Sequence, residues 1–194
     1  GTIFDHAARA EAIQTYYDDK QQQITSALMD VSESERPRTL VAQYTTQGDS
    51  EAFLVPPAGW MQTQMTELAG GIPVWKDHAQ GGWTVINLEQ VAAWNPDTIF
   101  VISYFDPVIK VVSQLKEDPQ WQALNAVETG AIYGFPGDFY SWDQPDTRWI
   151  LGLTWMATRL HPERFAEIDL QEEILAFYET LYELDAETVE SEVL

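Results

Sequence analysis

The sequence predicts an α/β protein: a three-layer αβα lobe with a mostly parallel sheet, preceded by a long N-terminal helix. Three observations predict this fold. From residue 39 onward, short β-branched apolar runs alternate with segments of helical periodicity, which is typical of parallel strands joined by helices. The run 98–104 is apolar at nearly every position, as in a parallel strand covered on both faces. Residues 4–31 carry apolar side chains at three- and four-residue steps, as in one long helix.

Turn-forming residues divide the first half of the chain. A polar break from Ser32 to Arg38 follows the long helix, and Gly70-Gly71 is a usual stop after a helix. Pro73 cannot donate to a strand ladder, so the strand that contains it is expected at a sheet edge. The expected elements are a helix over 4–31, a strand over 39–44, a long loop over 45–59 that contains Gly48 and Asp49, a helix over 60–69 and an edge strand over 72–75.

The second half continues the alternation of helices and strands. Asn87 is suited to cap a short helix that carries Glu89 in its first turn, and Asn95-Pro96-Asp97 ends that helix. The last ten residues form an acidic tail that is expected to fray. The expected elements are helices over 88–94, 107–115, 149–160 and 170–184, strands over 98–104 and 131–135, and a helical turn over 121–124.

The composition of the chain excludes several classes of binding partner and several kinds of chemical site. Ten basic and 31 acidic residues give the chain a formal net charge of −21. This charge repels nucleic acid and anionic membrane surfaces, so neither is expected as a partner. The chain contains no cysteine, which excludes disulfides, thiolate metal sites and cysteine nucleophiles. It also has no apolar run of about 18 residues, the length that a membrane-spanning helix needs.

Motifs for catalysis are missing from the sequence. It contains no glycine-rich dinucleotide or phosphate loop, no nucleophile elbow and no zinc-protease motif. Of the three histidines, His6 is expected on the solvated face of the first helix and His161 at a helix end, so His78 alone lies in a presumed strand-end loop. One alternative stays open, namely an α/β enzyme on a large aromatic or sugar substrate, with His78 paired to Asp138 or Asp143.

Aromatic side chains gather in the loops that follow the strands. In parallel sheets ligands bind beyond the carboxyl ends of the strands, and the loops expected there cover 45–59, 76–83, 104–107 and 137–144. Flat apolar rings with polar edges suit a large, partly planar organic ligand. Phe105 and Phe139 could equally close the core over the sheet, whereas Tyr140 and Trp142 favour a binding site. The candidate ligand contacts are Trp83, Tyr104, Phe105, Phe139, Tyr140 and Trp142.

Four segments resemble the ABC-transporter substrate-binding proteins for iron–siderophore complexes, haem and cobalamin. They occur in the family's order between residues 39 and 184. The segments are 68–71 (LAGG), 94–101 (WNPDTIFV), 121–133 (WQALNAVETGAIY), and 149–157 followed by 161–165 (WILGLTWMA and HPERF).

The resemblance implies two α/β lobes joined by a single long helix, with the ligand between the lobes. It covers the helix, expected within residues 1–36, and the C-terminal lobe, expected over 37–194. The N-terminal lobe is expected to be absent from this chain, because the chain starts within the helical pattern. A lobe of this kind would expose an apolar helix face and an open half-cleft, so we expect self-association or weak ligand binding.

In function, the resemblance implies a substrate-binding component that does no chemistry and needs no cofactor. It would capture an iron complex, either a siderophore or haem, and deliver it to the membrane permease of an ABC importer. Cobalamin is the alternative ligand within the family. A related branch binds bare metal ions through histidines and carboxylates, and the scarcity of histidine argues against it. The expected location is the periplasm, or the outer face of the membrane as an anchored lipoprotein.

The resemblance also implies roles for individual residues. Trp83 matches a ligand-contacting tryptophan of the cobalamin-type members, and Glu89 matches a glutamate that docks on permease arginines. A carboxylate in the first turn of a helix is favoured by the helix dipole, which suits that contact. Phe139, Tyr140 and Trp142 match the family's last binding loop. Arg148 matches an arginine at the start of the following helix, which either binds an anionic ligand or ties the helix to the loop.

Overall fold

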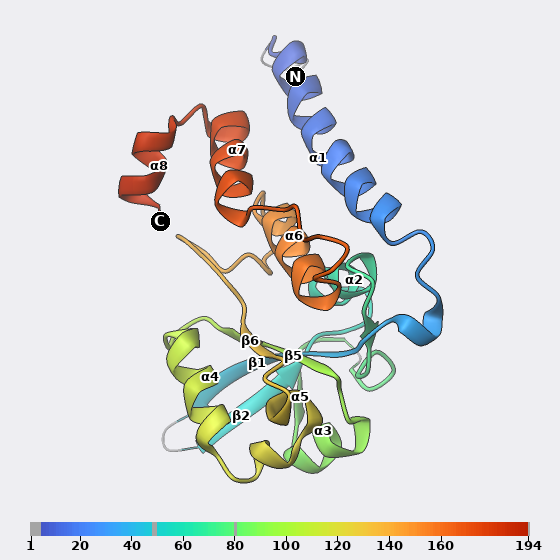
Figure 1. The fold of residues 1–194 in the computed structure, drawn as a ribbon. Coiled ribbons are helices and arrows are strands. Elements are labelled where there is room, and N and C mark those ends of the chain that lie inside the picture. The colour runs from blue at the N-terminus through green and yellow to red at the C-terminus, as the bar shows by residue number, and fades with distance from the viewer. Residues whose placement is uncertain (1–4, 48–49, 80, 194) are drawn as a thin grey trace.

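A computed structural model of the chain describes residues 5–47, 50–79 and 81–193. Its centre is a mixed six-stranded sheet in the order β4-β2-β1-β5-β6, with β3 paired to β1 beside this path (Figure 1). Strands β3, β5 and β6 run parallel to their neighbours, whereas the β1–β2 and β2–β4 pairs are antiparallel. The strands are β1 (Arg38–Gln47), β2 (Ser50–Val55), β3 (Ile72–Pro73), β4 (Thr84–Ile86), β5 (Thr98–Ser103) and β6 (Ile132–Gly134).

Helices cover both faces of the sheet, which confirms the predicted three-layer fold. Helices α3, α4 and α5 lie on one side, and α2 and α6 lie on the other, with α1 and α7 packed beyond α6 (Figure 1). The helices are α1 (Ala7–Ala27), α2 (Met61–Leu68), α3 (Leu88–Trp94), α4 (Val108–Glu117), α5 (Asn125–Glu128), α6 (Trp149–Leu160), α7 (Leu170–Tyr182) and α8 (Ala186–Glu192), with short 3-10 turns at Glu33–Glu35 and Trp121–Ala123.

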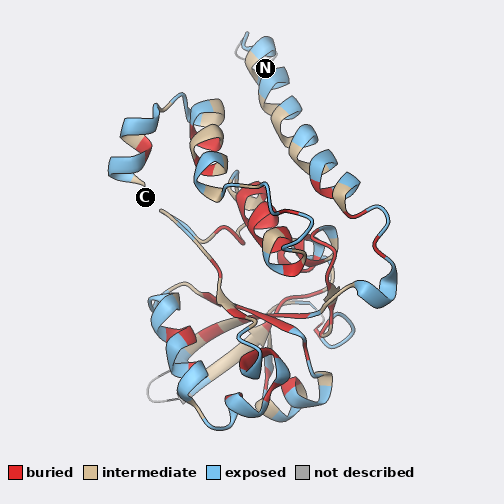
Figure 2. Cartoon of the chain, in the orientation of Figure 1, coloured by how far each residue is buried: buried red, intermediate tan, exposed pale blue. Residues whose placement is uncertain are grey.

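Strand β5 lies at the centre of the core. Residues 99–102 of β5 have no exposed surface, as expected of a strand covered on both faces. On one face, the Phe100 ring lies 5.2 Å from the Trp155 ring of α6. Buried residues accordingly concentrate in the sheet and α6, whereas α1 and α8 are largely exposed (Figure 2).

Sequence patterns near the ends of α3 and α6 predicted correctly where both helices begin and end. The Asn87 side chain accepts a hydrogen bond from the Gln90 backbone N–H at 2.9 Å, and the Gln90 side chain accepts one from the Asn87 N–H at 3.1 Å. This reciprocal capping box satisfies two backbone donors that a helix start otherwise leaves open. Helix α6 covers 149–160, as its long apolar face and the following His161-Pro162 predict.

The expected loop over 45–59 is wrong, because most of it forms a hairpin. Strand β1 extends to Gln47 and pairs with β2, and β4 then adds to β2. Gly48 and Asp49 of the expected loop lie outside the described residues. Ring contacts hold the hairpin on the core: Phe53 lies 5.6 Å from Tyr44 and 4.7 Å from Trp121. This extension adds two antiparallel pairs to the three parallel pairs of the sheet, so the sheet is mixed.

The expected frayed tail over 185–194 is also wrong for its described part. The Asp185 side chain accepts a hydrogen bond from the Thr188 N–H at 2.8 Å, which caps the start of α8. Val189 of α8 is fully buried. Helix α8 lies against α7, and Val189 is its buried side chain, so the acidic segment joins the core.

The long N-terminal helix is confirmed as α1, and Phe4 of the expected range lies outside the described residues. Its C-terminal half packs on α6 and α7. The Tyr17 ring stacks on Trp149 at 5.7 Å, and the Lys20 ammonium donates to Glu173 at 2.7 Å. Its first turns are mostly exposed (Figure 2). Within the described ranges, no helix has both the length and the apolar character needed to cross a bilayer.

Candidate functional site

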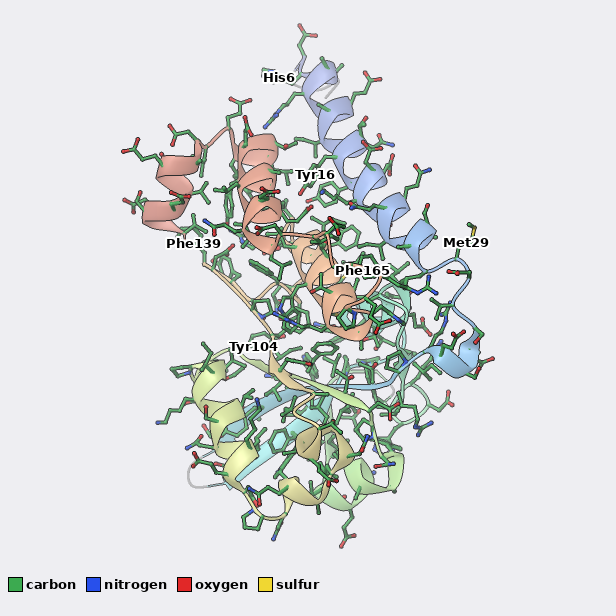
Figure 3. All side chains as sticks on the ribbon, viewed as in Figure 1. His6, Tyr16, Met29, Tyr104, Phe139 and Phe165 are labelled. Atoms are coloured by element: carbon green, nitrogen blue, oxygen red, sulfur yellow. The ribbon has the colours of Figure 1, made fainter. Side chains whose placement is uncertain are left out.

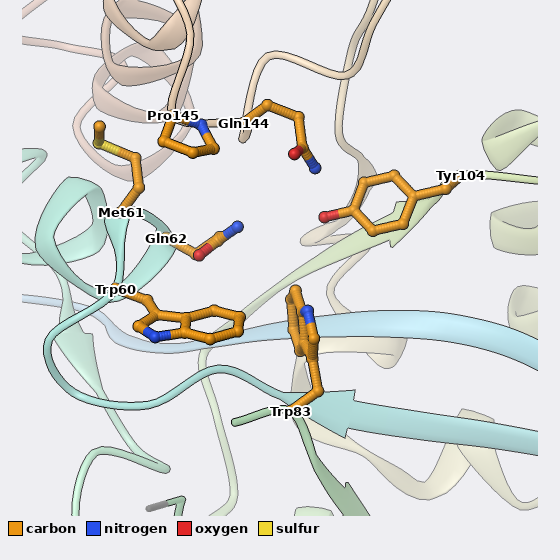
Figure 4. Close-up of a pocket in the computed structure, with 7 residues that line it drawn as sticks. All are labelled: Trp60, Met61, Gln62, Trp83, Tyr104, Gln144 and Pro145. Atoms are coloured by element: carbon orange, nitrogen blue, oxygen red, sulfur yellow. The ribbon is translucent and has the colours of Figure 1, made fainter. Parts of the chain in front are cut away.

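Two adjoining hollows lie where β5 and β6 end. The first, here called the aromatic hollow, has a volume of about 410 Å³ (Figure 4). Its lining comes from α2, the segment before β4, the end of β5 and the loop before α6. The lining residues are Trp60, Met61, Gln62, Trp83, Tyr104, Gln144 and Pro145.

Two tryptophans form the apolar wall of the aromatic hollow. The rings of Trp60 and Trp83 meet edge to face, with centroids 5.8 Å apart and planes at 88°. Trp60 immediately precedes α2, and Trp83 immediately precedes β4. The buried Trp75 indole donates to the Pro56 carbonyl at 2.8 Å, which holds the segment leading to Trp60 against the core. The wall therefore presents flat apolar surface to a ligand.

A buried polar group forms the inner side of the same hollow. One oxygen of Asp143, Oδ2, accepts a hydrogen bond from the Gln62 amide at 2.8 Å and another from the Tyr104 hydroxyl at 2.7 Å. Asp143 has no exposed surface and Gln62 is 5% exposed. Burial, and next the negative charge of Asp143, raises the pKa of Tyr104. Tyr104 therefore keeps its proton at neutral pH.

The second cavity, here called the loop hollow, has a volume of about 710 Å³. It shares Tyr104 and Gln144 with the aromatic hollow, so the two form one continuous surface. Phe139 lies at the outer end of the loop, and Tyr104 lies nearer the sheet (Figure 3). The lining residues are Ser103, Tyr104, Pro107, Val108, Phe135, Gly137, Asp138, Phe139, Tyr140, Ser141 and Gln144.

Asp138 anchors the loop that carries these aromatics. Its carboxylate accepts hydrogen bonds from the Tyr178 hydroxyl at 2.5 Å, the Trp142 indole at 3.1 Å and the Arg148 guanidinium at 2.7 Å. Burial alone would raise the pKa of Asp138, but the donated bonds and the charge of Arg148 hold it below its usual range. The loop is thus tied to both α6 and α7.

The structure brings together four of the predicted ligand contacts. Trp83 and Tyr104 line the aromatic hollow, and Tyr104, Phe139 and Tyr140 line the loop hollow. Phe139 and Tyr140 are 65% and 66% exposed, so neither closes the core. Phe105 is 84% exposed but lies outside both linings.

Trp142 and Arg148 are placed differently from expectation. Trp142 is 6% exposed and lies beneath the loop, where its indole bonds to Asp138. Arg148 pairs with Asp138 and Asp146, and its side chain is 11% exposed. Of its two expected roles, the contacts show the one that ties α6 to the loop. Glu89 is exposed in the first turn of α3, as predicted.

Trp60, Gln62 and Gln144 were not predicted as site residues, and Asp143 was named only as a possible partner of His78 in the enzyme alternative. Gln62 and Asp143 are 81 positions apart, and no local pattern indicates that they meet. Trp60 had a usable signal, because it follows the Pro56-Pro57 segment at the start of a helix. The enzyme alternative gains no support: His78 contacts Gln90 and Trp94 of α3, whereas Asp138 and Asp143 bond to other groups.

Comparison with known proteins identifies relatives. The sequence model of the family described as "Periplasmic binding protein" matches residues 1–139. The molybdate-binding protein MolA of Haemophilus influenzae is 29% identical over 102 residues, which cover 52% of this chain and 28% of MolA. Within the described residues, no group of three or more histidine, aspartate and glutamate side chains could hold a metal ion.

Solved structures of relatives share the fold. MolA bound to molybdate is 26% identical with a TM-score of 0.72, covering 90% of this chain and 51% of MolA. A periplasmic solute-binding protein of Veillonella parvula is 25% identical with a TM-score of 0.78. The match covers 100% of this chain and 57% of the Veillonella protein. Helicobacter pylori CeuE, solved with nickel and histidine, has a TM-score of 0.76 at 17% identity, and the match covers 95% of this chain and 56% of CeuE. At this identity the likeness shows the fold alone.

The chain spans about half the length of these solved relatives. MolA is a molybdate periplasmic binding protein, and the Veillonella protein is a periplasmic solute-binding protein. The family model matches most of the sequence, and the matched range includes three of the four segments that carry the resemblance. The chain therefore belongs to the periplasmic binding protein family.

Proposed function

We propose that the protein is the substrate-binding component of an ABC importer and acts in the periplasm. The observation that carries this proposal is the continuous surface of two hollows at the carboxyl ends of β5 and β6, in a chain of this family. Strand-end crevices are the usual ligand sites of open α/β sheets. One relative, MolA, is the cognate binding protein of a Haemophilus influenzae ABC transporter.

The proposed ligand is an iron complex of an organic chelator, either a siderophore or haem. Trp60, Trp83 and Tyr104 offer apolar and aromatic surface, which suits a bulky organic ligand better than a small ion. Cobalamin fits the same argument and stays the alternative. The relative MolA binds molybdate, so molybdate belongs among the ligands to be tested.

We further propose that the two hollows form one wall of a cleft between two lobes, with α1 as the linking helix. Exposed rings such as Phe139 would then meet ligand or a second lobe. An open wall favours self-association of this chain, which gel filtration at several concentrations would detect. A clean monomer that binds ligand tightly would contradict this part of the proposal.

Glu89 is the proposed contact to the permease. It is exposed in the first turn of α3 and makes no side-chain hydrogen bond or ion pair with the described residues. A carboxylate in this position is available to an arginine of a partner protein. Charge reversal, Glu89→Lys, should abolish transport in cells while leaving ligand affinity unchanged.

Tryptophan fluorescence tests the binding function. Ferric siderophores, haem, cobalamin and molybdate are titrated into the protein, and we expect quenching by an iron complex. Trp83→Phe should reduce the quenching, whereas the matched Trp94→Phe, on α3 outside both hollows, should not. If none of the four kinds of ligand quenches the fluorescence, the proposed function is wrong.

A further inference from the structure

The hydrogen bonds around Asp143 fix which atoms the aromatic hollow presents. A carboxylate can only accept hydrogen bonds, so both partners of Asp143 must act as donors. Tyr104 uses its single hydroxyl hydrogen for this bond, and Gln62 uses its amide N–H. The Tyr104 hydroxyl hydrogen and one of the two amide hydrogens of Gln62 therefore point toward Asp143, which leaves the oxygens of Tyr104 and Gln62 for other partners.

The orientation of the Gln62 amide is set by the same carboxylate. Turning the amide over would place its oxygen 2.8 Å from the Asp143 oxygen, which brings two acceptors into contact. Figure 4 shows the Gln62 amide and the Tyr104 hydroxyl converging on the hollow from α2 and β5. The buried oxygen of Gln62, Oε1, has no hydrogen-bond partner in the described part of the chain, and neither has Oδ1 of Asp143.

The walls supply no charge that would attract an anion. Among the described residues that line the aromatic hollow, none is cationic. The arginine at the start of α6, Arg148, pairs with Asp138 and Asp146. Buried acceptors without donors are costly, so a ligand that donates hydrogen bonds gains more there than one that only accepts them.

We propose that Gln62 and Tyr104, held by Asp143, form an acceptor site that selects ligands carrying O–H or N–H groups, neutral or positively charged, and rejects oxyanions such as molybdate. This inference rests on the proposed ligand-binding function and names the ligand chemistry of that site. Asp143 is a positioning residue here, because it acts through Gln62 and Tyr104.

Calorimetric titration with matched probes tests the selection. The probes are a ferric linear trihydroxamate with a terminal ammonium group, the same complex with a methyl group in place of that ammonium, and molybdate. We expect the ammonium form to bind about tenfold tighter than the methyl form, and molybdate to show no binding. Equal affinities for the two forms, no binding of either, or binding of molybdate as tight as that of the ammonium form overturns the inference.

Variants then assign the selection to these residues. Asp143→Asn removes the charge and frees the Gln62 amide to turn, so the tenfold preference should fall to about twofold or less. Tyr104→Phe should weaken the preference too, while Tyr133→Phe on β6, outside both hollows, should leave it unchanged. Thermal melts identify any variant that does not fold, in which case Tyr104→Phe carries the test.

Unchanged preference in a folded Tyr104→Phe protein contradicts the inference even if the protein still binds ligand. The proposed function fails separately, when none of the ferric siderophores, haem, cobalamin or molybdate quenches tryptophan fluorescence. The two results are distinguishable because one measures the ratio of two affinities and the other measures whether binding occurs.

Discussion

Replacing Gly152 by alanine should destabilise the protein, although the same change usually stabilises a helix. Gly152 lies inside α6, where alanine is favoured over glycine by about 1 kcal/mol. A Cβ atom at this position would lie 2.4 Å from the Trp142 carbonyl oxygen and 2.8 Å from the end of Met65. Met65 can rotate away, but the Trp142 carbonyl belongs to a backbone that Asp138 and Asp143 hold on either side.

The expected loss of stability in Gly152→Ala is the difference between two opposing free-energy terms. Overpacking of a filled core costs typically about 1–3 kcal/mol, and the gain in helix propensity offsets about 1 kcal/mol of it. Because the clash is with backbone, we take the upper half of the overpacking cost. The free energy of unfolding should therefore fall by a net amount of about 1–2 kcal/mol. For a chain of this size the melting temperature should fall by about 2–8 °C.

Urea unfolding followed by tryptophan fluorescence measures this loss. Gly59→Ala is the matched control, because a Cβ atom there would have no neighbour within 4 Å. The control should stay within about 0.5 kcal/mol of the wild type. If Gly152→Ala is as stable as the wild type or more stable, the close contact between α6 and the loop is not as described.

Three further predictions concern other parts of the fold. Trp142→Ala should lower the free energy of unfolding by about 3–5 kcal/mol, and a loss of ligand affinity with unchanged stability would contradict the buried placement. Burial lowers the pKa of His161 below its ordinary value, although its Nε2 bonds to the Gly70 carbonyl. The folded state then binds fewer protons, so stability should fall as the pH drops below about 6.5, and His161→Gln should flatten this dependence in urea melts at pH 7.5 and 5.5. Val189→Ala removes two buried methyl groups and should cost about 1.6 kcal/mol; an unchanged urea midpoint would show that α8 is not packed.

Local patterns predicted the elements whose signals lie within a few residues. The cap at Asn87 and the apolar face of residues 149–160 gave correct helix bounds, and the continuous apolar run gave β5. The hairpin was missed because β2 is defined by its pairing with an extended β1, which no local pattern reveals. The same limit applies to the site. Trp83 and Tyr104, which line the aromatic hollow, were expected there from their places in loops after predicted strands. Asp143 reaches the hollow through contacts with Gln62 and Tyr104, which are far away in the sequence.

The loop before α6 carries two buried carboxylates five positions apart, and each is held by a different part of the fold. Asp138 binds α7 and Arg148, and Asp143 binds α2 and the end of β5. Between them, Phe139 and Tyr140 are exposed on a backbone that is tied at both ends. The entropy of ordering this backbone is therefore lost during folding rather than on contact with a ligand. A preorganised segment of this kind lets a largely exposed aromatic surface bind without first having to become rigid.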